Sequence, residues 1–75
     1  MTPPRPSRAA IDAALSVLRA KERELLSLAR CRQDAAASYP WLPDVPRWRR
    51  SAKRDAAAAD LLDEAIAWME RQRDG

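Results

Sequence analysis

The sequence predicts an all-α protein in which two helices form an antiparallel hairpin, and two such hairpins pair into a four-helix bundle. Three observations support this prediction. The chain of 75 residues is rich in alanine, with one glycine and no phenylalanine, which suits helices and not sheets. Apolar residues recur at spacings of three, four and seven over two long segments. A short proline-rich segment separates the two, and a continuous helix cannot form there.

The N-terminal part is expected to be a tail followed by a helix. Residues 1–6 contain three prolines, which favour an extended, disordered tail. Ser7 is placed to cap a first helix that covers about residues 8–37. Lys21 and Glu22 interrupt the apolar stripe of this helix with one turn of charge. The stripe consists of Ile11, Ala14, Leu15, Leu18, Leu25, Leu28 and Ala29.

A connection over about residues 38–45 leads into a second helix over about residues 46–73. Asp44 followed by Pro46 resembles a helix start, with an acidic cap and a proline in the first turn. Ser51 is the alternative cap. We prefer the earlier start, because a start at Ser51 would place two cations at the positive end of the helix dipole.

The apolar arc of the second helix is wide, and it includes Ala58, Leu61, Leu62, Ala65, Ile66, Trp68 and Met69. At about 100° per residue the arc covers roughly 160°, which is more than one neighbouring helix needs. A chain this short also needs a further source of stability. With Cys31 as the single cysteine and no histidine, neither an internal disulfide nor a zinc site supplies it. We therefore expect a homodimer, and we expect Trp68 in the core. The core or dimer residues are Leu15, Leu18, Leu25, Leu28, Leu61, Leu62, Ile66, Trp68 and Met69.

Residue types that perform catalysis are scarce. No histidine is present for general acid–base chemistry, and Cys31 lacks a histidine that would activate its thiol. We therefore expect no enzymatic activity, no cofactor and no metal site. The carboxylates of Asp60, Asp63 and Glu64 are expected to form a solvated face opposite cations of the first helix. These cations are Arg19, Lys21 and Arg23.

The strongest charge signal is a basic cluster of five cations within eight residues, Arg47, Arg49, Arg50, Lys53 and Arg54. The hairpin brings Arg30 and Arg32 to the same end. Three interpretations stay open: a solvated helix start capped by aromatic residues, a docking surface for a protein with an acidic or apolar surface, and a nucleic-acid site. Seven carboxylates from Asp44 onward argue against a long surface that follows phosphates.

The connection places large apolar side chains beside the basic cluster. Its prolines favour an extended conformation, so presenting Trp41 and Leu42 to a partner costs little ordering entropy. The alternative is that Trp41 folds back onto the helices. The candidate partner-binding residues of this end are Tyr39, Trp41, Leu42, Arg47, Trp48, Arg49, Arg50, Lys53 and Arg54.

The whole chain, with two helices, a proline- and tryptophan-rich corner from Tyr39 to Trp48 and no catalytic groups, resembles small helical proteins encoded by bacteriophages. This class, which includes anti-CRISPR and anti-quorum-sensing proteins, binds and inhibits host factors. The resemblance lies in the architecture and not in a motif. It implies a small inhibitor or modulator that occludes a surface of a partner protein such as a host regulator. The alternative is a small basic protein that binds nucleic acid or modulates transcription.

The setting is expected to be the cytoplasm, with no membrane as partner. The net charge of +3 is a mild excess, no apolar run approaches the length of about 18 residues that spans a bilayer, and the first residues contain no apolar signal core.

Overall fold

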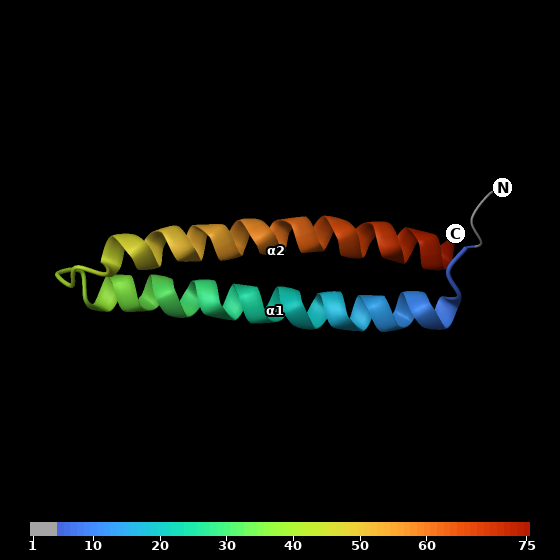
Figure 1. The fold of residues 1–75 in the computed structure, drawn as a ribbon, viewed down its shortest axis with the longest axis horizontal. Helices are drawn as coiled ribbons and strands as arrows, with labels where there is room; N and C mark the ends of the chain where they lie inside the picture. The colour runs from blue at the N-terminus through green and yellow to red at the C-terminus, as the bar shows by residue number, and fades with distance from the viewer. Residues whose placement is uncertain (1–4) are drawn as a thin grey trace.

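The computed structural model describes residues 5–75, which form two helices joined by a short connection (Figure 1). Helix α1 spans Arg8–Ser38 and helix α2 spans Val45–Asp74. The helices run antiparallel and pack against each other along the rod, so the start of α1 and the end of α2 meet at one end. Residues 5–75 contain no strand, and the rod measures 58 × 21 × 14 Å. The predicted all-α hairpin is confirmed, whereas its pairing into a four-helix bundle stays a prediction.

Hydrogen bonds cap both ends of helix α1. The hydroxyl oxygen of Ser7 accepts a hydrogen bond from the backbone N–H of Ala10 at 3.1 Å, which satisfies one of the unpaired donors of the first turn. At the other end, the backbone N–H of Tyr39 donates to the carbonyl of Ala35 at 2.9 Å. The disordered tail expected for residues 1–6 falls largely on residues 1–4, which lie outside the described residues.

The connection consists of two successive turns and not of the extended segment that we expected. The backbone N–H of Leu42 donates to the carbonyl of Tyr39 at 3.1 Å, and that of Val45 donates to the carbonyl of Leu42 at 3.2 Å. Each turn carries a proline at its second position, Pro40 and Pro43, where the fixed backbone angle of proline suits a turn. The prolines therefore stiffen the corner by folding it.

Helix α2 starts beside Pro46, which lies in the first turn, where a missing N–H leaves no hydrogen bond unmade. The expected capping by the Asp44 side chain is wrong, because that carboxylate makes no capping hydrogen bond. Asp44 already has helical backbone angles, and its carbonyl accepts a hydrogen bond from the N–H of Trp48 at 3.0 Å. Asp44 therefore acts as an early helical residue through its backbone.

A seam of buried and half-buried residues joins the two helices. Its positions alternate in steps of three and four, which is the seven-residue repeat of a coiled coil. The seam residues of α1 are Ile11, Leu15, Leu18, Glu22, Leu25, Ala29, Arg32 and Ala36. Those of α2 are Val45, Trp48, Ala52, Asp55, Ala59, Leu62, Ile66, Met69 and Arg73. Charged residues thus occupy seam positions, which the apolar pattern of the sequence alone does not reveal.

The seam changes character along the rod. In the loop half, which we define as residues 27–59, the fully buried residues are small: Ala29, Ala36, Val45, Ala52 and Ala59. In the distal half, which comprises residues 5–26 and 60–75, the core consists of Ile11, Leu15 and Ile66, with Leu18 and Met69 packed against it. The loop half therefore depends on close helix contact, and the distal half on large apolar side chains.

Ion pairs join the helices in both halves. In the loop half, the guanidinium of Arg32 donates to the carboxylate of Asp55 across the alanine seam, and the Asp55 side chain is only 17% exposed. At the distal end, Arg73 lies 3.5 Å from Asp12 and 3.2 Å from Asp74. The hydrogen bond and charge of Asp74, with a smaller effect of Asp12, raise the pKa of Arg73 above its ordinary value.

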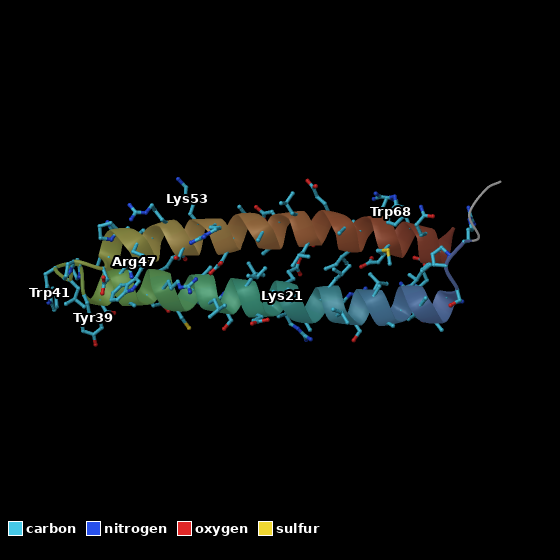
Figure 2. All side chains as sticks on the ribbon, viewed as in Figure 1. Lys21, Tyr39, Trp41, Arg47, Lys53 and Trp68 are labelled. Atoms are coloured by element: carbon cyan, nitrogen blue, oxygen red, sulfur yellow. The ribbon has the colours of Figure 1, made fainter. Side chains whose placement is uncertain are left out.

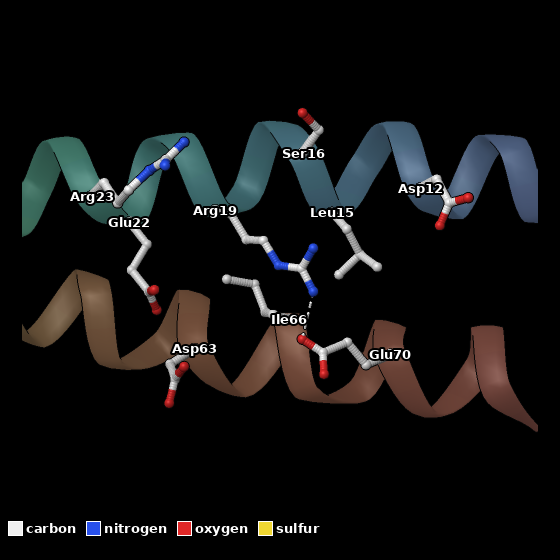
Figure 3. A pocket seen from close by; sticks show the side chains of 9 residues that line it. All are labelled: Asp12, Leu15, Ser16, Arg19, Glu22, Arg23, Asp63, Ile66 and Glu70. Atoms are coloured by element: carbon white, nitrogen blue, oxygen red, sulfur yellow. Dashed lines mark hydrogen bonds and ion pairs between the residues drawn. The ribbon is translucent and has the colours of Figure 1, made fainter.

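The residues beside the seam form two flanks, because a residue that follows a seam position and one that precedes it lie on opposite sides of the helix. The side of the following residues is an open groove of about 630 Å³, shown in Figure 3. Arg19, Asp63 and Glu70 line it, and Arg19 donates to Glu70 from α1 to α2 at 2.8 Å. We call this side the charged flank. Arg19, Arg23 and Asp63 all line this groove, as expected of a charge-complementary face, but Arg19 pairs with Glu70 and Lys21 lies on the opposite side of the seam.

Along residues 14–28 of α1 and 58–68 of α2, the side of the preceding residues is the apolar flank, which consists of Ala14, Val17, Lys21, Glu24, Leu28, Ala58, Leu61, Ala65 and Trp68. Its large apolar side chains are exposed, with 67% of the Leu61 surface and 52% of the Trp68 surface accessible. Within the hairpin the expectation of a buried Trp68 is wrong. The wide apolar arc of α2 divides into a seam that faces α1 and a flank that faces solvent.

Candidate functional site

The loop end of the rod carries the most exposed aromatic residue of the molecule. Figure 2 shows Tyr39 and Trp41 at the tip of the connection, at the opposite end from Trp68. The surface of Trp41 is 73% exposed, and Tyr39 and Leu42 are exposed beside it. Trp41 therefore does not fold back onto the helices. We call Tyr39, Trp41 and Leu42 the aromatic tip.

The aromatic tip is preorganised. The rings of Tyr39 and Trp41 meet edge to face, with centroids 5.9 Å apart and planes at 80°. The two proline turns fix the backbone beneath them, and Tyr39 is also tied to the last turn of α1. A partner that binds these rings would order few new torsions, so little of its binding energy is lost to entropy.

The basic cluster surrounds the start of α2 and does not form one stripe. Arg47 precedes a seam residue and so lies on the side of the apolar flank, whereas Arg49 and Lys53 follow seam residues and lie on the side of the charged flank. Arg50 is directed away from α1. In Figure 2 both Arg47 and Lys53 belong to α2, and Arg47 lies closer to the aromatic tip than Lys53 does. The cluster thus presents cations on several sides of α2, at the end of the rod that carries the aromatic tip.

These cations are not neutralised within residues 5–75. Arg47, Arg49, Arg50 and Lys53 are exposed, and no carboxylate of the described residues lies within ion-pair distance of them. Arg54 donates only to the hydroxyl of Ser51, at 3.5 Å. Four cations at one end of the rod are therefore available to carboxylates or phosphates of a partner.

Two residues that the sequence assigned to this end serve the hairpin instead. Trp48 is half-buried at a seam position, so it closes the loop end of the core and offers only part of its ring to a partner. Arg32 is engaged with Asp55. The signal that would have identified both is the alternation of three- and four-residue steps from Val45 and from Ile11, which places each of them in the seam.

Charge is distributed unequally between the two halves. The loop half contains seven cations and three carboxylates, whereas the distal half contains seven cations and eight carboxylates. The excess charge of the molecule therefore lies at the end that carries the aromatic tip. A field of one sign around an exposed apolar anchor accelerates encounter with a partner of opposite sign.

The groove of the charged flank is a weaker candidate. Its lining mixes both signs, with Asp12, Glu22 and Asp63 beside Arg19 and Arg23. Arg19 is already engaged by Glu70 of the opposite helix. Across residues 5–75, no three side chains of the metal-binding types His, Cys, Asp and Glu are grouped closely enough to hold a metal ion. We interpret the groove as a solvated, charge-complementary face.

Comparisons with known proteins give no relative, since the chain matches no protein-family model, no curated protein and no solved structure. Neither of the two described helices combines the length and the apolar character that crossing a membrane requires.

Proposed function

We propose that the chain is a non-enzymatic binding protein that occludes a surface of a partner protein with its loop end. Trp41, Tyr39 and Leu42 fill an apolar depression on the partner. The surrounding cations pair with partner carboxylates. The protein acts in this proposal as a stoichiometric inhibitor or modulator, comparable to the phage-encoded inhibitors of host regulators that its architecture resembles.

The observation that carries the proposal is the preorganised, exposed aromatic tip next to four cations at the start of α2 that pair with no carboxylate of the described residues. Tryptophan, tyrosine and arginine are the residue types that dominate the binding energy of protein interfaces. Large apolar rings on a free surface are energetically unfavourable, and two turns hold Trp41 in that position. A corner that served only to connect the helices would need neither exposed ring.

The test is affinity capture from a nuclease-treated lysate of the cells in which the protein occurs. We expect the wild type to retain one protein, and we expect Trp41→Ala to weaken its affinity by about 2 kcal/mol or more. The double variant Arg49→Glu/Arg50→Glu should also lose the partner. Arg71→Glu changes an exposed cation near the other end of α2 and should retain it. Unchanged affinity of both loop-end variants would show that this end is not the binding surface.

Nucleic acid is the second candidate, and the four unpaired cations of the basic cluster favour it. Cations would contact phosphates, and Trp41 would stack on an unpaired base. In that case the logarithm of the affinity falls with the logarithm of the salt concentration, with a slope of about −0.9 for each phosphate contacted on duplex DNA. Absence of binding to duplex and single strands at low salt would remove this candidate. The spread of the cations over several sides of α2 favours a compact protein partner.

The proposal includes a homodimer and a cytoplasmic setting. A two-helix rod has a thin core, and Leu15 is the largest side chain that is almost completely buried in it. Cys31 is an exposed free thiol, which is typical of reducing compartments. Both are tested separately from partner binding, the dimer by its mass in solution and the setting by fluorescence localisation of the tagged protein.

A further inference from the structure

The apolar flank has the composition of an interface and not of a solvent-exposed surface. From Ala58 to Trp68 the α2 residues of this flank are all apolar, and on α1 it carries two charges, Lys21 and Glu24. These two charges neutralise each other within α1 at 3.4 Å. The opposite flank is mostly charged and has Leu26 as its one large apolar residue in the distal half, so this half of the rod has one mostly charged side and one mostly apolar side.

The order of residues along the apolar flank of α1 is nearly the same in both directions. Starting from a point between Lys21 and Glu24, one step outward on either side leads to a large apolar residue, Val17 in one direction and Leu28 in the other. An antiparallel copy of α1 that is centred on this point would therefore place Val17 on the partner's Leu28 and Lys21 beside the partner's Glu24. The two charges would be paired across the interface and the apolar residues would meet each other.

The α2 side of the flank has a matching arrangement. Around the same level of the rod, Ala58 and Trp68 lie at equal distances on either side, and Leu61 and Ala65 do so closer in. An antiparallel copy would thus pair large with small residues, Trp68 with Ala58 and Leu61 with Ala65. This alternation lets two surfaces interdigitate without a void.

We propose that two copies of this chain pair through their apolar flanks in an antiparallel arrangement, with α1 on the partner's α1 and α2 on the partner's α2. The two-fold axis passes across the rod near Lys21, Glu24, Leu61 and Ala65. Because this axis lies near the middle of α1, the result is a four-helix bundle over most of the rod, in which the distal half of each copy lies along the loop half of the other. The connections with their aromatic tips, and the first turns of α2, lie at its two opposite ends.

The distribution of charge selects a second, antiparallel copy over a parallel one. In a parallel pair Lys21 would lie on Ala65 and Glu24 on Leu61 of the partner, so both charges would be covered by apolar side chains. A parallel pair would also bring the two loop halves together, each with seven cations and three carboxylates. The antiparallel pair separates them. With about 20 residues between the axis and each tip and a rise of 1.5 Å per residue, the two tips lie about 60 Å apart.

This geometry deepens the proposed homodimer and does not depend on what the loop end binds. It gives the protein two identical binding ends that point in opposite directions. One dimer can then engage two partner molecules, or two sites of an assembly that are about 60 Å apart.

The first experiment measures the mass of the purified full chain by sedimentation at micromolar concentration. We expect twice the chain mass of 8.5 kDa. Leu61→Asp places a charge on the apolar flank outside the seam, and it should weaken the dimer at least tenfold while the circular dichroism of the helices persists. Leu26→Asp is the matched control, because Leu26 is also an exposed leucine but follows a seam residue and lies on the other flank. It should leave the dimer intact. A monomeric wild type, or equal loss of the dimer in both variants, would overturn the proposal.

The second experiment tests the orientation by charge exchange. Lys21→Glu and Glu24→Lys should each weaken the dimer, because like charges then meet across the two-fold axis. When the two single variants are mixed in equal amounts, an antiparallel pair brings opposite charges together again, so native mass spectrometry should show almost only heterodimers. A parallel pair offers these charges no partner, and a purely statistical mixture would overturn the antiparallel arrangement.

Discussion

The two halves of the rod share one seven-residue seam, but they differ in the residues that fill it and in the surface beside it. In the distal half the seam is filled with Ile11, Leu15 and Ile66, and an apolar flank lies exposed beside it. In the loop half the seam is lined with alanine and bridged by Arg32 and Asp55, and the surface is cationic around an aromatic corner. The same secondary structure therefore supports a half rich in apolar surface and a half rich in charge.

If the loop half binds a partner as proposed, the difference separates the part of the hairpin that stabilises the fold from the part that recognises the partner. Large seam residues bury more apolar area and stabilise the distal half, and the proposed dimer would bury its flank as well. The alanine seam of the loop half stabilises less through burial, so the ion pair and the proline turns have a larger share in holding it. The end that is least stabilised by burial is the end that carries the candidate binding site.

The largest effect is expected from shrinking the seam of the distal half. Leu15→Ala removes the most completely buried large side chain and leaves a cavity, which should destabilise the fold by about 3 kcal/mol. Urea unfolding at one fixed protein concentration, followed by circular dichroism, measures this value. A loss below about 1 kcal/mol would mean that the distal seam is not the main source of stability.

The loop half should respond to the opposite change. Ala52→Leu inserts a large side chain where the helices meet over alanine, and it should destabilise the fold by about 1–3 kcal/mol through overpacking. Ala57→Leu makes the same exchange at an exposed position of α2 and should leave the unfolding midpoint nearly unchanged. If Ala52→Leu were instead stabilising, the helices would not be in close contact there.

The ion pair within the alanine seam should contribute more than the one across the charged flank. Asp55→Ala leaves the partly buried Arg32 without its partner, so we expect a loss of about 1–2 kcal/mol, between the values of exposed and buried pairs. Glu70→Ala breaks the exposed pair with Arg19 and should cost less than about 1 kcal/mol. Equal losses of unfolding free energy in chemical denaturation would show that the partial burial of the Arg32–Asp55 pair does not strengthen it.

The smallest effect on stability is expected at the aromatic tip. Trp41→Ala removes a side chain that is largely solvent-exposed, and the unfolding free energy should change by no more than about 0.5 kcal/mol. Thermal unfolding of the variant beside the wild type measures this. A large loss of stability would assign Trp41 to the packing of the hairpin and remove the main support for a recognition role.

The sequence predicts the hairpin well because its local signals are strong. Ser7 marks where α1 begins, the prolines of the connection mark where a helix cannot continue, and the apolar spacing marks the helices themselves. The seam is harder to find, because Glu22, Arg32 and Asp55 occupy seam positions, while Leu28 and Leu61 stand one residue outside it. A count of apolar residues therefore merges seam and flank into one broad stripe.

The site is predictable in composition but not in detail. Aromatic and cationic residues around residues 39–54 identify the loop end from the sequence. Whether Trp41 is exposed and Trp48 half-buried depends on the pairing register of the two helices, which no local pattern contains. The same register places Arg32 opposite Asp55, so Arg32 pairs with that carboxylate and does not add a free cation to the loop end.

The measurement that tests the separation of recognition from assembly most directly is a capture experiment with three immobilised proteins: wild type, Trp41→Ala and Leu61→Asp. Each is exposed to the same nuclease-treated lysate, and its own mass is determined beside it. We predict that wild type and Leu61→Asp retain the same protein, although Leu61→Asp is a monomer, and that Trp41→Ala stays a dimer but retains nothing. Loss of the captured protein by Leu61→Asp, together with its retention by Trp41→Ala, would place recognition on the apolar flank and contradict the division of the rod proposed above.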